Sequence, residues 1–152
     1  MVYVTIHAAW MILAVIIGTV AGYQGLVRAT QRAGGASPLP GRFRMKSHVS
    51  LGTIYFVMVY AGLALGVVLA DVFLGDRNVL PPAIAKAHIV LAILIAILYG
   101  AGWLIGRRLA RVPARGSRLA PRLHMLLNFT ACTLIGVQIA LALYYVWIWP
   151  KI

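Results

Sequence analysis

Residues 87–106 read AHIVLAILIAILYGAGWLIG, a run of twenty residues without one Asp, Glu, Lys or Arg. A helix needs about 20 largely apolar residues to cross the hydrocarbon core of a bilayer. Three further stretches are longer and equally free of charge, at residues 1–27, 47–70 and 123–150. A lipid core admits only helices or closed barrels, and these stretches lack the alternating pattern of barrel strands. They therefore predict four membrane-spanning helices.

The predicted fold class is all-α: an integral membrane up-down four-helix bundle that forms a single domain over residues 1–152. The predicted helices cover approximately residues 3–27, 44–70, 83–107 and 121–148. No loop between them is longer than the 19 residues of 28–46, so no soluble domain fits between the helices. Residues 1–27 lack the basic start of a secretory signal peptide, and their apolar run is too long for one.

The composition excludes several classes of protein. Of the 152 residues, 62% are hydrophobic and 11% are charged. A soluble globule of this size could not cover so much apolar surface, and a disordered chain would be less hydrophobic. The single cysteine, Cys132, rules out a fold held together by intrachain disulfides. The net charge of +12 would suggest nucleic acid in a soluble protein, but no basic patch with interleaved aromatic residues lies outside the membrane stretches. No nucleic-acid partner is expected.

The charged residues are sorted between the loops. The first loop holds only cations, which are Arg28, Arg32, Arg42, Arg44 and Lys46. The third loop also holds only cations, which are Arg107, Arg108, Arg111, Arg115, Arg118 and Arg122. The second loop is neutral, with Asp71, Asp76, Arg77 and Lys86. Cationic loops stay cytoplasmic and attract anionic lipid headgroups. Both termini are therefore expected on the outer (periplasmic) side of a prokaryotic inner membrane.

Each predicted helix has one histidine near its start: His7, His48, His88 and His124. Because successive helices run in opposite directions, His7 and His88 come to the outer side and His48 and His124 to the cytoplasmic side. Each pair belongs to helices that lie diagonally across an up-down bundle, where bundles place cofactors. In most of the helices, Gly and Ala dominate the positions that follow the histidine on the same face. These small residues predict empty space at the far end of the helix for a large flat ring held by the other histidine pair. Ionisable groups inside a membrane are costly and usually serve a function.

Two imidazoles at each depth suit a porphyrin iron with both axial positions filled. A zinc site needs three or four ligands, and no Cys, Met or carboxylate stands beside either pair. The chain has no CxxCH motif, so haem would be held non-covalently. The sequence thus predicts two b-type haems, electron transfer as their work, no catalytic residue, and four iron ligands. These metal ligands are His7, His48, His88 and His124.

Further residues are candidates for contacts with the haems. The propionates need cationic partners, and four cations stand two or four residues before a histidine. These are Arg44, Lys46, Lys86 and Arg122. Arg44 shares the face of the histidine that follows it, whereas the others would have to snorkel, and an anchoring role at the interface is an equal alternative for each. Asn128, one turn from His124, could bond a quinone carbonyl or a ligand imidazole. A hydrogen bond between helices is the favoured interpretation for Asn128 and for Gln138.

This arrangement resembles the core of the cytochrome b561 superfamily, four consecutive helices with one histidine each. The resemblance rests on TIHAAWMIL at 5–13, MKSHVSLG at 45–52, AKAHIVL at 85–91 and RLHMLLN at 122–128. It implies two bis-histidine haems, one held by His7 with His88 on the outer side and one by His48 with His124 on the cytoplasmic side. It also implies electron passage between the two membrane faces, and often a homodimer.

The main interpretation is a dihaem cytochrome b that exchanges electrons with a quinone or a redox protein at either face. Whether it also acts as a quinone-linked oxidoreductase stays open. One alternative is a haem-bearing anchor subunit of a larger oxidoreductase complex, since little of the chain lies outside the membrane to capture a soluble donor. The other is a non-redox membrane protein, a small transporter or assembly protein, whose histidines handle protons or metal. That alternative predicts no bound haem.

Overall fold

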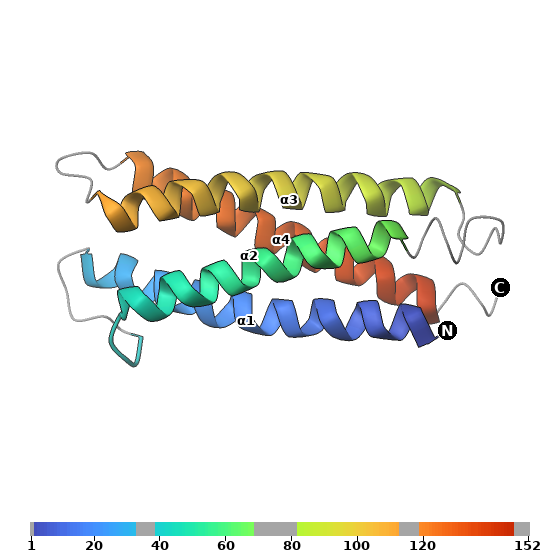
Figure 1. Ribbon diagram of the computed structural model, residues 1–152, viewed down its shortest axis with the longest axis horizontal. Helices are drawn as coiled ribbons and strands as arrows, with labels where there is room; N and C mark the ends of the chain where they lie inside the picture. The colour runs from blue at the N-terminus through green and yellow to red at the C-terminus, as the bar shows by residue number, and fades with distance from the viewer. Residues whose placement is uncertain (1, 33–38, 69–81, 113–118, 148–152) are drawn as a thin grey trace.

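A computed structural model describes residues 2–32, 39–68, 82–112 and 119–147. They form four helices, which are α1 (Val2–Arg32), α2 (Met45–Val68), α3 (Pro82–Arg111) and α4 (Leu119–Trp147). Successive helices run antiparallel, and the start of α1 lies at the same end of the bundle as the end of α4 (Figure 1). The described residues contain no strand, and each helix is long and apolar enough to cross a membrane. The predicted fold of four membrane-length helices is confirmed for this part of the chain, and it is compatible with a multi-pass membrane protein.

The helices begin within two residues of their predicted starts, but two of them end later than predicted. The first helix continues to Arg32 rather than residue 27, and the third to Arg111 rather than residue 107. The predicted ends were set where charge begins. Arginine is a good helix former, and its long side chain reaches the headgroups from a turn outside the hydrocarbon. The first arginine therefore marks the edge of the apolar span and not the end of the helix.

The four helices form two antiparallel hairpins. α1 packs against α2, α3 packs against α4, and contacts between α2 and α3 join the two hairpins. α1 and α4 make little backbone contact. In Figure 1, α2 and α4 cross between α1 and α3. The first and third helices, and the second and fourth, are therefore the diagonal partners of the bundle.

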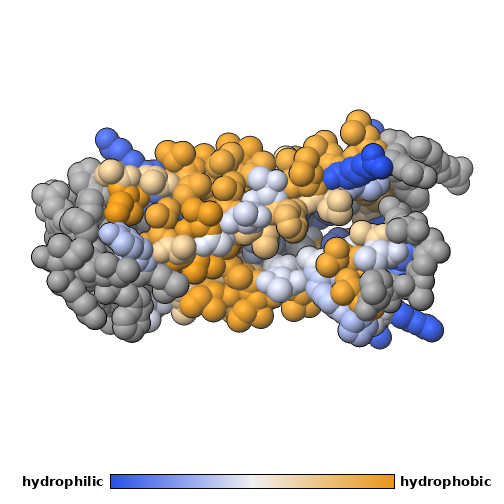
Figure 2. All heavy atoms as spheres, turned by 180° about the vertical axis from the view of Figure 1, so that it is seen from behind, coloured by the Kyte–Doolittle hydropathy of each residue, from blue (hydrophilic) through white to orange (hydrophobic). Residues whose placement is uncertain are grey.

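The core is narrow, and aromatic rings fill its middle. Its buried side chains are Ala14, Tyr55, Met58, Val59, Ile95, Tyr99, Ala131 and Ile135. The rings of Tyr55 and Tyr99 meet edge to face with their centroids 4.8 Å apart. Outside this core, large apolar side chains such as Leu104 and Phe129 are 63% and 72% exposed. On the face that Figure 2 shows, hydrophobic side chains cover the middle of the molecule and hydrophilic ones lie toward its ends, the pattern of a surface that faces lipid.

Gly18 lets α1 approach the core at Tyr55. A Cβ atom at Gly18 would lie 2.8 Å from ring carbons Cε2 and Cζ of Tyr55, closer than carbon atoms pack in proteins. We expect Gly18→Ala to destabilise the protein by about 1–3 kcal/mol, as overpacked cores do, and to lower its melting temperature in detergent by several degrees. Gly22 faces open space, so Gly22→Ala should leave that temperature unchanged or slightly raised. Equal losses in the two variants would contradict this account.

Candidate functional site

His48 and His124 lie together at the end of the bundle where α2 and α4 begin. Their ring centroids are 6.2 Å apart, and the ring planes are nearly perpendicular, at 83°. The ring of Phe43, in the segment before α2, is tilted against His48 with the centroids 5.7 Å apart. Both imidazoles are partly buried. The structure thus brings together two histidines that are 76 residues apart in the sequence, from diagonal helices.

A backbone carbonyl of the neighbouring helix holds each of these two imidazoles. Nδ1 of His48 lies 3.0 Å from the carbonyl oxygen of Ala21 in α1. Nδ1 of His124 lies 2.7 Å from the carbonyl oxygen of Gly102 in α3. A carbonyl oxygen can only accept, so in each ring Nδ1 carries the proton and Nε2 keeps its lone pair. This tautomer can ligate a metal, and such a bond commonly orients metal-binding imidazoles.

A glycine lies against each imidazole of this pair. A Cβ atom at Gly25 in α1 would be 3.3 Å from Cε1 of His48, and one at Gly106 in α3 would be 2.7 Å from Cε1 of His124. In both hairpins the accepting carbonyl belongs to the residue four before the glycine, so the two hairpins repeat one arrangement. The sequence predicted empty space for a flat ring at such positions. In the structure, the imidazole edge of the neighbouring helix takes that space.

His7 and His88 lie at the opposite end of the bundle, near the starts of α1 and α3. A Cβ atom at Gly66 in α2 would lie 3.2 Å from Cε1 of His7. Nδ1 of His7 is buried without a hydrogen-bond partner among the described residues, and so is Oε1 of Gln138. Nε2 of Gln138 donates to the backbone oxygen of His88 at 3.1 Å. Gln138 therefore forms the kind of bond between helices that its sequence position suggested.

The distance between the two histidine pairs follows from residue counts on three helices. In each, 18 residues separate the histidine from the glycine that lies beside a histidine of the other pair. The three intervals are His7 to Gly25, His48 to Gly66 and His88 to Gly106. At about 1.5 Å per residue this interval is about 27 Å, close to the ~30 Å thickness of a bilayer's hydrocarbon core. The pairs therefore lie near the two ends of the apolar span.

Asn128 contacts His124 from within the same helix. Its Nδ2 donates to the backbone oxygen of His124 at 2.6 Å and lies 3.3 Å from Nδ1 of the same residue. Because Nδ1–H already donates to Gly102, it cannot also accept from the amide. The bond of Asn128 is therefore to its own helix, and among the described residues it does not form the bond between helices that its sequence position favours.

The four cations predicted to meet propionates lie on the surface. All four side chains are exposed, and they belong to Arg44, Lys46, Lys86 and Arg122. The backbone N–H of Arg44 donates to Oε1 of Gln24 at 3.1 Å, which ties the segment before α2 to α1. Sequence reasoning missed this role of Gln24. It also missed the two carbonyl acceptors, because a backbone oxygen has no signature in the side-chain pattern.

In the described ranges, no group of three or more His, Cys, Asp or Glu side chains is arranged to hold a metal ion. No family model matches the chain, and no curated protein or solved structure matches it. The geometry of the histidines is therefore the basis for assigning a function.

Proposed function

We propose that this protein is a dihaem membrane cytochrome b, similar to the core of the cytochrome b561 superfamily, that carries electrons across a membrane. His48 and His124 would hold one haem, and His7 and His88 the other. We place both termini and the second pair on the outer side, and the cationic loops on the cytoplasmic side, of a prokaryotic inner membrane. The electron donor and acceptor would be a quinone or a redox protein at either face.

The observation that carries this proposal is the geometry of His48 and His124. A metal–imidazole bond is about 2 Å long, so two imidazoles can share one metal only when their rings lie within several ångströms of each other. The ring centroids of His48 and His124 are 6.2 Å apart. Both Nδ1 atoms bond to carbonyl oxygens, which leaves both Nε2 lone pairs for a metal. Two imidazole nitrogens are the donor set of a b-type haem.

The protein's own residues would hold and orient the cofactor. Bound haem supplies one-electron chemistry at iron. The carbonyls of Ala21 and Gly102 would keep the two imidazoles in the tautomer that ligation needs. Asn128 bonds to the carbonyl of His124 and so supports this part of α4. The partly buried position of the rings limits the access of water, which tunes a redox potential.

The other histidine pair is less complete in its hydrogen bonds. Nδ1 of His7 and Oε1 of Gln138 have no hydrogen-bond partner in the described part of the chain. Buried polar groups are normally satisfied. The His7 and His88 site therefore rests on the placement of its residues at one end of the bundle, on diagonal helices.

The absorption spectrum of the detergent-purified protein tests the proposal directly. We expect sharp low-spin b-type bands after dithionite reduction and two haems per chain in a pyridine haemochrome assay. A stable, folded protein without colour would overturn the proposal and favour the non-redox alternative. A haem-loaded chain that is stable only together with another polypeptide would favour the role of an anchor subunit.

A further inference from the structure

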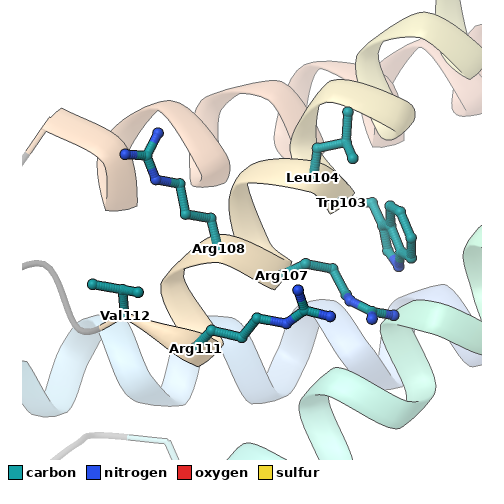
Figure 3. Close-up of a pocket in the computed structure, with 6 residues that line it drawn as sticks. All are labelled: Trp103, Leu104, Arg107, Arg108, Arg111 and Val112. Carbon is teal, nitrogen blue, oxygen red and sulfur yellow. The ribbon is translucent and has the colours of Figure 1, made fainter.

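The basic end of α3 carries a groove of about 360 Å³ on the outside of the bundle. Its lining residues are Trp103, Leu104, Arg107, Arg108, Arg111 and Val112 (Figure 3). Three guanidinium groups, one indole and two aliphatic side chains thus line one groove where the apolar span ends. We propose that this groove binds the headgroup of an anionic phospholipid. This inference does not depend on the proposed electron transfer.

The indole of Trp103 is held firmly beside the arginines. Its Nε1 donates to Oγ1 of Thr53 at 3.3 Å, and its ring stacks on Phe56 with centroids 4.4 Å apart and planes at 13°. The guanidinium carbon of Arg107 lies 4.9 Å from the centre of the Trp103 ring. In Figure 3, Arg107 and Arg111 extend toward the side of Trp103, whereas Arg108 extends toward α4. Two of the three cations therefore converge beside an ordered ring.

No carboxylate among the described residues neutralises these arginines. Residues 28–46 and 107–122 together contain 11 of the 14 basic residues of the chain and neither of its two acids, Asp71 and Asp76. The described residues include neither Asp nor Glu. An anion from outside the described part of the chain is therefore needed to balance them. Arginine is well suited to phosphate, because its planar fork donates two parallel hydrogen bonds to two oxygens.

The apolar part of the groove favours a lipid as the source of that phosphate. Leu104 and Val112 are 63% and 65% exposed and lie on the same helix end as the arginines. Tryptophan is the aromatic residue typical of the level of the headgroups. A phospholipid would cover the aliphatic side chains with an acyl chain and the guanidiniums with its phosphate. A free phosphate or an acidic peptide would leave the aliphatic side chains bare.

Native mass spectrometry of the delipidated protein tests this site. Phosphatidylglycerol and phosphatidylcholine with the same acyl chains would be titrated separately, and inorganic phosphate added as a competitor. We expect phosphatidylglycerol to bind at least about tenfold more tightly than phosphatidylcholine, and the double variant R107Q/R111Q to lose that preference. Phosphate at millimolar concentration should not displace the lipid.

Two further variants separate the site from the general positive field. R42Q/R122Q removes the same charge from the same end of the bundle outside the groove, and it should keep the preference. R107K/R111K keeps the charge but loses the planar fork, and it should weaken binding by a smaller factor than the glutamine pair. Equal losses in R42Q/R122Q and R107Q/R111Q would overturn the site. So would equal binding of the two lipids, or displacement of the lipid by phosphate alone.

Discussion

The variant His124→Ala should bind one haem where the unchanged protein binds two. The ring centroid of His124 lies 6.2 Å from that of His48, and the Nδ1 of His124 is hydrogen-bonded to the carbonyl oxygen of Gly102. Among the described residues no group of three or more His, Cys, Asp or Glu side chains is arranged to hold a metal there, so removing His124 takes half of the ligand set from that site. The haem count per chain, from a pyridine haemochrome assay, should fall from two to about one, with the spectrum of the other site retained.

Two matched variants make this result specific. His88→Ala should remove the other haem, so the spectra that remain in the two single variants should differ. Met125→Ala changes an exposed side chain next to His124 in α4 without removing an imidazole, and it should keep both haems. Loss of both haems in one single variant, or the same remaining spectrum in both histidine variants, would contradict the diagonal pairing.

Gly106→Ala should give the second large effect. Its Cβ would lie 2.7 Å from Cε1 and 3.1 Å from Nδ1 of His124, a ring already fixed by its bond to Gly102. The ring must either give up that bond or push α3 away from α4. We expect about 1–3 kcal/mol of destabilisation, visible as a lower melting temperature of the protein without added haem. We also expect a 10–100-fold weaker affinity for haem at the His124 site, the usual effect of disturbing the residues that support a metal-ligating histidine.

The other glycines provide a graded comparison. A Cβ atom added at Gly25 would lie 3.3 Å from Cε1 of His48, a looser contact than at Gly106. One added at Gly136 would face open space. The loss of stability should therefore decrease in the order Gly106→Ala, Gly25→Ala, Gly136→Ala. If Gly136→Ala were as harmful as Gly106→Ala, contact with the imidazole would not be the cause.

Much of the fold could be predicted because charge is so costly in a lipid core. Four stretches without charge located the four helices, and the starts agreed within two residues of the structure. The ends of α1 and α3 could not be found in this way. Arginines continue a helix as well as most residues do, so the last turns before Arg32 and Arg111 have no distinguishing sequence feature.

The placement of the histidines could also be read from spacing, since antiparallel helices put alternate histidines at opposite ends. The hydrogen bonds that hold the rings could not be predicted from the sequence. Ala21 and Gly102 act through backbone oxygens that every residue has, and only the approach of the helices decides which of them a histidine meets. For the same reason the role of Gly25 and Gly106 differed from the prediction, because the neighbouring helix supplies the group that fills their space.

Once inserted, the bundle cannot turn over. Eleven basic residues and no acid lie in residues 28–46 and 107–122, at one end of the bundle, and moving one charge across a potential of 100 mV costs about 2.3 kcal/mol. Reversing the chain against such a potential would cost roughly 25 kcal/mol from the field alone. In the membrane arrangement proposed above, a chain that has taken up one orientation would therefore keep it. Every copy in a membrane should then present the same end to the same compartment. The proposed electron transfer would therefore have the same direction relative to the bundle in every copy.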